Sequence, residues 1–471
     1  MHYRFLFCLS LAFITVLQSH SQPLEKRLAT AIKNLASDPQ LKGGMASLCV
    51  ADTTGKILFH LNDEYGLAPA SNMKIFTCIA ALDLLGKSYQ YKTEIGFSGE
   101  IKDSILKGNL FIKGNGDPTT GSWRYAQTGA DSLMKRLSKI LLQNGIKKIN
   151  GQVILDGSSF SSNPIPGGWS WEDMGNYYGA GTWGLNWHEN QYDMHLRPGK
   201  NISDSTKIES IDPQIGYVTF NNELKTAAAG SGDKSLIYLP PNGDVGSIEG
   251  TIPQGGLFTV SGSLPDPYTP MISSIKKGFA DNQIVHTGGF QTSADFALTN
   301  KLLPHYDSLL NYLYSPTLDS LIYQFMKHSI NFYGEDFTKT IALQKTGYGT
   351  TKEGVQIIKK FWTDRGIDST AINITDGSGL SATTRVTTEA LVKALLYAKH
   401  RDWYATFYNA LPVVNNMHMK TGTIFGTKAY SGYQIALNGK EYVFSIIVSN
   451  YNGPAAAVVD KIYAVLNELK K

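Results

Sequence analysis

The sequence predicts an α/β (α+β) protein in which one discontinuous domain, built from both ends of the chain, is interrupted by a β-rich insertion. Apolar residues at helical spacing mix with strand-like alternation at both ends of the chain. The stretch between them is rich in Gly, Pro, Asn and Ser, and turn residues separate its short alternating runs. We expect the domain at 22–98 plus 297–471. We expect the insertion at 99–296, as one or two subdomains with the inner one at about 193–263.

The first residues carry the pattern of a secretory signal peptide at 1–21. Arg4 precedes an apolar run at 5–16 that is too short to span a bilayer comfortably. Small residues suit cleavage just before Gln22, and a retained N-terminal anchor is the alternative. We therefore expect a periplasmic or secreted protein with at most peripheral membrane contact.

Composition narrows the class of protein. The chain has 471 residues with 42% hydrophobic and 17% charged, which is ordinary globular usage and excludes wholesale disorder. A net charge of +4 without a basic cluster argues against a nucleic-acid partner. Outside the signal only Cys49 and Cys78 remain, so a disulfide framework is excluded, while a single bridge or two buried thiols stay open.

The elements of the discontinuous domain follow from their apolar periods. A helix is expected at 24–36, followed by a strand hairpin at 45–52 and 55–62. Later helices and strands show the same two periods; we expect helices at 315–337, 352–366, 388–400 and 455–470, and strands at 429–437 and 441–450. Short strands are expected in the insertion at 108–114, 151–157, 216–222 and 256–262.

The first motif that carries chemistry is S-x-x-K in "APASNMKIFTC", where Ser71 precedes Lys74 at the start of an apolar helix. Positions i and i+3 share one face of a helix, so the serine hydroxyl can reach the lysine amine. A lysine base must be partly neutral, and burial in a helix that is apolar on most sides lowers its pKa. The competing interpretation is a helix-capping serine beside a solvated lysine. Three other pairs match formally without opening such a helix: Ser132–Lys135, Ser273–Lys276 and Ser274–Lys277.

The second motif is S-x-N within "LIYQFMKHSINFYGEDF", which gives Ser329 and Asn331. A polar pair in an amphipathic helical run finds local hydrogen bonds or marks a break in the helix. A serine there can move a proton between a lysine and a leaving group, and an asparagine can hold the lysine and a substrate carbonyl. The same pattern at 161–163 lies in a turn-like stretch of the insertion.

The third motif is K-T-G-T at 420–423, at the start of a strand pattern. A lysine and a threonine hydroxyl form a cationic, hydrogen-bonding seat for a carboxylate. A glycine allows close backbone approach, and a following N–H can serve an oxyanion hole. A second K-T-G at 345–347 is expected in a loop, so Lys420 is preferred.

In this order the three motifs are the signature set of the penicilloyl serine transferases. The chain resembles the class C low-molecular-mass penicillin-binding proteins, D-alanyl-D-alanine carboxypeptidases/endopeptidases with a large insertion between their first and second motifs. Other similar stretches are "LKGNLFIKGNGDPT", "WSWEDMGNYYGAG" and "ITDGSGLS". The resemblance implies a β-lactamase-like transpeptidase core whose antiparallel sheet is flanked by helices.

The resemblance also implies roles for the motif residues. Ser71 is the acylated nucleophile and Lys74 its general base, while Ser329 and Asn331 relay protons and position groups. The third motif binds the terminal carboxylate of a peptide or a β-lactam, through Lys420, Thr421, Gly422 and Thr423. The backbone N–H groups of Ser71 and Thr423 form the oxyanion hole. No metal or organic cofactor is needed.

The implied reaction is acyl transfer from D-Ala-D-Ala termini or peptide crosslinks of peptidoglycan. The partners are then peptidoglycan stem peptides, with β-lactam antibiotics as inhibitors. A serine β-lactamase or esterase on the same fold is one alternative. A non-catalytic cell-wall-binding protein is another.

Overall fold

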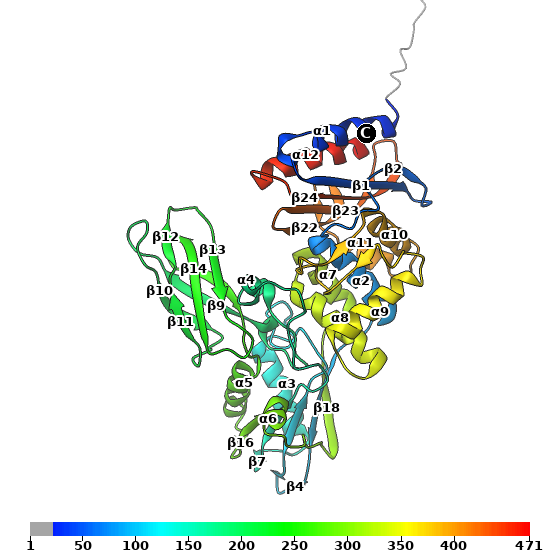
Figure 1. The fold of residues 1–471 in the computed structure, drawn as a ribbon. Helices are drawn as coiled ribbons and strands as arrows, with labels where there is room; N and C mark the ends of the chain where they lie inside the picture. The colour runs from blue at the N-terminus through cyan, green and yellow to red at the C-terminus, as the bar shows by residue number, and fades with distance from the viewer. Residues whose placement is uncertain (1–21) are drawn as a thin grey trace, which may run out of the picture.

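A six-stranded antiparallel sheet joins the two ends of the chain (Figure 1). The structure, a computed structural model, describes residues 22–471, and the signal peptide expected at 1–21 lies outside them. The strand order is β2-β1-β24-β23-β22-β21, so the N-terminal hairpin lies against the C-terminal strands. The strands are β1 (Met45–Asp52), β2 (Ile57–Leu61), β21 (Val413–Val414), β22 (Met417–Ile424), β23 (Thr427–Ile435) and β24 (Glu441–Ser449).

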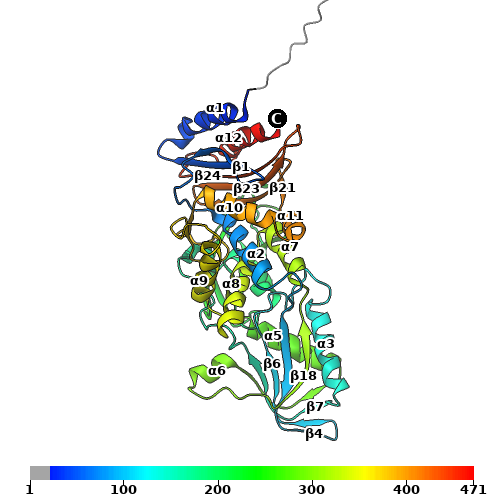
Figure 2. The same cartoon turned by 90° about the vertical axis from the view of Figure 1, so that its right-hand side faces the viewer.

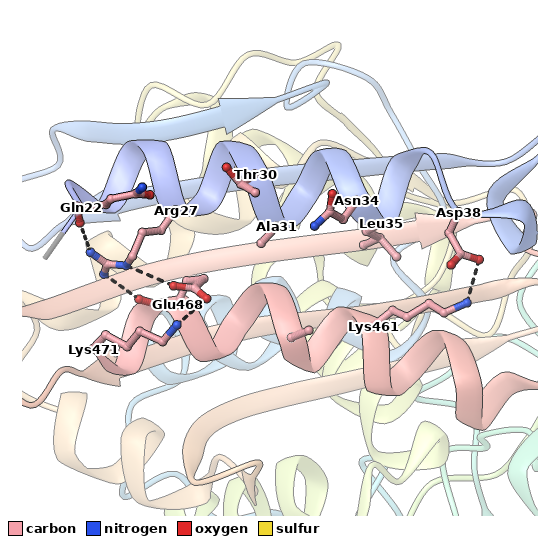
Figure 3. A pocket seen from close by; sticks show the side chains of 11 residues that line it. Gln22, Arg27, Thr30, Ala31, Asn34, Leu35, Asp38, Lys461, Glu468 and Lys471 are labelled. Carbon is pink, nitrogen blue, oxygen red and sulfur yellow. Dashed lines mark hydrogen bonds and ion pairs between the residues drawn. The ribbon is translucent and has the colours of Figure 1, made fainter.

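One face of this sheet is covered by the first and last helices, α1 (Leu24–Ala36) and α12 (Ala455–Leu466) (Figure 2). Leucine and isoleucine side chains at helical spacing in α1 are buried in this layer. Ion pairs link the two ends of the chain along a groove between the helices: Arg27 with Glu468 at 3.1 Å, and Lys461 with Asp38 at 2.7 Å (Figure 3).

The other face carries a layer of six helices, one of which, α2, is buried on almost all sides by its neighbours. Its Phe76 ring packs edge-on against Trp362 at 5.4 Å between centroids. The helices are α2 (Met73–Leu84), α7 (Leu318–His328), α8 (Asn331–Thr346), α9 (Thr351–Thr363), α10 (Thr388–Lys399) and α11 (Tyr404–Ala410). A two-stranded ribbon, β19 (Ile372–Asn373) with β20 (Arg385–Val386), encloses the loop that reaches the site.

The middle of the chain forms a second body with its own core (Figure 1). One sheet has the order β17-β8-β6-β3-β18 and a smaller one β16-β7-β5-β4. The strands are β3 (Lys92–Phe97), β4 (Glu100–Lys102), β5 (Ile105–Lys107), β6 (Leu110–Lys113), β7 (Lys148–Ile149), β8 (Val153–Asp156), β16 (Val285–His286), β17 (Phe290–Thr292) and β18 (Ser308–Tyr314). The helices are α3 (Ala130–Gln143), α5 (Tyr268–Asp281) and α6 (Ser293–Leu298). The larger sheet takes in β3 and β18, outside the limits of 99 and 296.

A third, all-β module projects from the second body (Figure 1). It holds a three-stranded sheet, β10-β9-β15, and a four-stranded one built on β14. The strands are β9 (Gln191–Arg197), β10 (Lys207–Asp212), β11 (Thr219–Asn222), β12 (Lys225–Ala227), β13 (Lys234–Tyr238), β14 (Val245–Pro253) and β15 (Phe258–Ser263). The short helix α4 (Trp171–Met174) lies between this module and the helical layer.

Two smaller expectations have outcomes in the fold. Cys49 and Cys78 are both free and buried, so the open choice resolves to two buried thiols. The mixed α/β fold class with a helix-flanked antiparallel sheet is confirmed. Within residues 22–471, no helix has both the length and the apolar character that a membrane crossing needs.

Candidate active site

Ser71 lies in a short 3-10 helix (Ala70–Asn72) that leads directly into α2. No side chain caps either helix start, so the interpretation of Ser71 as a helix cap is wrong. The Ser71 Oγ instead accepts a hydrogen bond from the Lys74 Nζ at 3.0 Å. Ala70 adopts a φ of 47°, a left-handed conformation that non-glycine residues rarely take, so this turn is held by its surroundings.

Lys74 is fully buried, and its amine has three hydrogen-bond acceptors. Besides Ser71, these are the Asn331 Oδ1 at 2.6 Å and the Ser378 carbonyl at 2.8 Å. Burial lowers the pKa of Lys74 to about 7, although the carboxylates of Asp376 and Glu335 act in the opposite direction. The amine is therefore partly neutral near neutral pH and able to accept a proton from the Ser71 hydroxyl.

The S-x-N motif marks a break in the helix, which was one of the two expectations for it. Helix α7 ends at His328 and α8 begins at Asn331, so Ser329 lies in the break between them. It adopts a left-handed conformation with φ 56° and ψ 40°. The break turns the Ser329 Oγ toward the Lys420 Nζ, which donates to it at 2.9 Å. Asn331 starts α8 between two partners, because its Nδ2 donates to the Tyr178 carbonyl at 2.8 Å while its Oδ1 faces Lys74.

Lys420 is the second buried lysine of the site. Its Nζ also donates to the Thr421 carbonyl at 2.9 Å. Burial, reinforced by the nearby charge of Lys74, lowers the pKa of Lys420 well below its usual value. The side chains of Ser71, Lys74, Ser329 and Lys420 thus form two hydrogen-bonded Ser–Lys pairs.

Gly422 brings strand β22 against the Ser71 turn. A Cβ at this position would lie 2.6 Å from the Pro69 carbonyl oxygen and 3.1 Å from the Ser71 nitrogen. Only glycine allows that approach without a shift of backbone. The Asn72 side chain fixes the same contact, because its amide lies 3.0 Å from the Lys420 carbonyl oxygen.

The other matches to the three motif patterns lie elsewhere in the structure. Ser132–Lys135 lies in α3, and the pairs at 273–277 lie in α5, both in the second body. The second K-T-G is not a loop: Lys345 and Thr346 end α8, and Gly347 caps it with a φ of 82°. The stretch at 161–163 is irregular, as expected.

The sequence of this chain is similar to known proteins over most of its length. The family model for the D-Ala-D-Ala carboxypeptidase 3 (S13) family matches residues 28–468. The chain belongs to the S13 family. This S13 chain is 27% identical over 469 residues to the D-alanyl-D-alanine carboxypeptidase of Actinomadura sp. (strain R39), a match that covers 92% of this chain and 83% of that one. The resemblance to penicillin-binding D-Ala-D-Ala carboxypeptidases is thereby confirmed.

Solved structures agree in fold with this S13 chain. The crystal structure of penicillin binding protein 4 (dacB) from Haemophilus influenzae superposes with a TM-score of 0.80 at 22% identity, covering 94% of this chain and 99% of that one. A crystal of the same protein complexed with a novel β-lactam gives a TM-score of 0.73 at 19% identity, with the same coverage of both chains.

Several residues near the site belong to none of the three sequence motifs. Glu335, one turn beyond Asn331 on α8, accepts the Gly377 N–H with both carboxylate oxygens at 3.1 Å. Burial, reinforced by Asp376, raises the pKa of Glu335 to about 8. Asp376 accepts from the Trp169 Nε1 at 3.0 Å and from two backbone N–H groups of its own loop. Asp376 lies in the stretch "ITDGSGLS" and Trp169 in "WSWEDMGNYYGAG", while Glu335 lies just beyond the S-x-N motif, but no spacing rule singled them out.

Proposed function

We propose that this S13 family member is a serine DD-peptidase that hydrolyses D-Ala-D-Ala termini, peptide crosslinks of peptidoglycan, or both, through an acyl-enzyme on Ser71. The observation that carries the proposal is the buried Lys74 amine, 3.0 Å from the Ser71 Oγ and with a pKa of about 7. The named activities of the relatives agree with this chemistry.

In the proposed acylation step, the Ser71 Oγ attacks the carbonyl carbon of the scissile amide while its proton passes to the neutral Lys74 amine. A tetrahedral oxyanion forms, and the backbone N–H groups of Ser71 and Thr423 are the proposed donors to it. The close approach of Gly422 to the Ser71 nitrogen supports this pairing of the two backbones.

Collapse of the intermediate breaks the amide C–N bond, and the leaving amine takes a proton. We assign its delivery to Ser329, whose hydroxyl is hydrogen-bonded to Lys420 and takes up in return the proton that Lys74 received from Ser71, so that Lys74 is neutral again. Asn331 holds Lys74 in place through its 2.6 Å contact. Water then attacks the ester and transfers a proton to the neutral Lys74. Lys74 passes this proton to the Ser71 Oγ as the ester C–O bond breaks, so that the peptide acid is released and the Ser71 hydroxyl is restored.

Thr421, Gly422 and Thr423 are the proposed seat of the substrate carboxylate. Pairing of β21 with β22 involves Met417 and His418, so within residues 22–471 the K-T-G-T segment has β23 as its strand neighbour. An extended peptide can therefore lie along the other edge of β22. We also propose that the chain is exported, as expected for an enzyme of the cell wall.

Intact mass spectrometry after treatment with benzylpenicillin tests the proposal. We expect a stable increment of one penicilloyl group per chain, mapped to the peptide that contains Ser71. Rapid turnover of the drug without an adduct would favour the β-lactamase alternative. No adduct and no turnover, with unchanged wall binding by Ser71→Ala, would favour the non-catalytic alternative.

A further inference from the structure

A third lysine lies beside the proposed carboxylate seat and belongs to none of the three motifs. Lys428 on β23 is the register partner of Thr423 on β22. Directly opposed residues of antiparallel strands place their side chains on the same face. The Lys428 Nζ accordingly donates to the Thr423 Oγ1 at 3.0 Å.

This position gives the amine access to an incoming anion. Thr423 is exposed and Lys428 partly exposed, at the end of the hairpin where β22 turns into β23. Among residues 22–471, the Thr423 hydroxyl is the one hydrogen-bond acceptor within reach of the Lys428 amine. An ammonium group has three N–H donors, so two remain for a ligand, and the Thr423 hydroxyl keeps its own proton to donate.

Lys420 is less suited to hold that anion. It is 1% exposed, and its amine is already engaged with the Ser329 Oγ and the Thr421 carbonyl. Burial also lowers the pKa of Lys420 well below its usual value. Partial burial lowers the pKa of Lys428 as well, and a carboxylate bound beside the amine acts in the opposite direction.

We infer that Lys428, together with the Thr423 hydroxyl, binds the carboxylate of the residue that follows the scissile bond and so selects the substrate. The inference rests on the proposed DD-peptidase function. It defines a substrate class: peptides whose leaving amine carries an adjacent free carboxylate, as a terminal amino acid does. Crosslinks whose leaving amine has no neighbouring carboxylate would be cleaved less well.

A pair of peptides tests this specificity: an N-acylated peptide ending in D-Ala-D-Ala and the same peptide with a C-terminal carboxamide. The ratio of the two kcat/KM values is measured for the wild type, Lys428→Met, Lys428→Arg and Lys440→Met. Lys440 is a matched control because it is an exposed lysine in the turn between β23 and β24 and its loss removes the same charge.

We expect the wild type to prefer the free carboxylate and Lys428→Met to lose roughly tenfold of that preference, since hydrogen bonds to charged groups are the stronger ones. Lys428→Arg should retain most of it, and Lys440→Met should leave the ratio unchanged. Added salt should reduce the ratio of the wild type more than that of Lys428→Met.

Two results would overturn the inference in distinguishable ways. If Lys428→Met keeps the wild-type ratio while benzylpenicillin still labels Ser71, the carboxylate is bound elsewhere and the proposed function stands. If the wild type neither cleaves the peptides nor forms a penicilloyl adduct, the proposed function fails and the inference fails with it. Circular dichroism of each variant confirms that a lost preference does not come from unfolding.

Discussion

Two regions of the molecule hold the proposed base, and they do so with different kinds of group. The helical layer and the turn before α2 contribute side chains at motif positions, since Asn331 on α8 and Ser71 both contact Lys74. The segment around α4 in the insertion contributes the Tyr178 carbonyl, which holds Asn331, and the Trp169 indole, which holds the loop of Ser378 through Asp376. The reacting atoms lie in one region, and part of their positioning lies in the other.

Substitution of the nucleophile gives the largest effect on the motif side of this comparison. Ser71→Ala removes the only atom proposed to form the acyl bond, so we expect penicillin labelling to fall at least about a thousandfold. The midpoint of thermal unfolding should remain within a few degrees of the wild type. Labelling with a fluorescent penicillin measures the first quantity, and undiminished labelling would remove Ser71 from the mechanism.

The pH dependence of acylation tests the base. The folded pKa of Lys74 is about 7, below the ordinary value for lysine, so the amine is protonated and inactive at low pH. The labelling rate should therefore rise as pH increases through about 7 and level off above it. Lys74→Arg, which stays protonated, should label more than about a hundredfold more slowly over pH 5.5–9. A wild-type rate independent of pH would contradict this assignment.

Gly422→Ala tests the contact between β22 and the Ser71 turn. The new Cβ would meet the Pro69 carbonyl oxygen and the Ser71 nitrogen, both backbone atoms, so the strand must move away. We expect acylation to slow by roughly ten- to a hundredfold, because a displacement near 1 Å costs about that much. Gly216→Ala is the matched control, since a Cβ there meets nothing within 4 Å. Equal rates for the two variants would show that the contact is not needed.

Trp169→Phe gives the smallest effect and tests the insertion side. It keeps an aromatic ring but removes the N–H that donates to Asp376 at 3.0 Å. We expect acylation to slow by about three- to tenfold, since one hydrogen bond to a carboxylate is lost away from the reacting atoms. Trp171→Phe serves as control because that side chain is 50% exposed. If both variants label at the wild-type rate, the insertion does not position the base.

The contrast between motif side chains and the contacts supplied by the insertion explains which parts of the site can be predicted from the sequence. Ser71, Lys74, Ser329, Asn331 and Lys420 are side chains whose chemistry requires their type and spacing, and the structure brings them into hydrogen-bonding distance. The hairpin at the N-terminus and the terminal helices follow apolar periods, which the fold reproduces.

Backbone contacts and buried polar faces leave no recognisable pattern in the sequence. The Ser378 and Tyr178 contacts use backbone carbonyls, which any residue type supplies. Helix α8 buries charged residues as well as apolar ones: Lys339 donates to the carbonyls of Asn163 and Thr182 in the insertion. A polar face that packs against another part of the chain is indistinguishable from a solvated one in the sequence.

The pairing of β3 and β18 leaves no pattern in the sequence either. Strands β3 and β18 alternate like any strand, and only their antiparallel pairing assigns them to the sheet of the second body. Helices α3 and α5 pack together in that body, although the sequence pattern indicates strands alone there. Composition therefore indicated the β-rich texture of this region but gave no signal for its helices.

The pairing of β1 with β24 has a consequence for how the molecule matures. Lys74 contacts Asn331 and Ser378 across 257 and 304 positions, and β1 takes its place in the sheet only when β24 is present. Contacts of such sequence separation form late and slowly. If Ser71 and Lys74 act as proposed, a chain emerging N-terminus first should therefore not form the acyl-enzyme until its last strands are made. Penicillin labelling should therefore occur only after β24 has joined the sheet. A chain truncated before β24 should not be labelled.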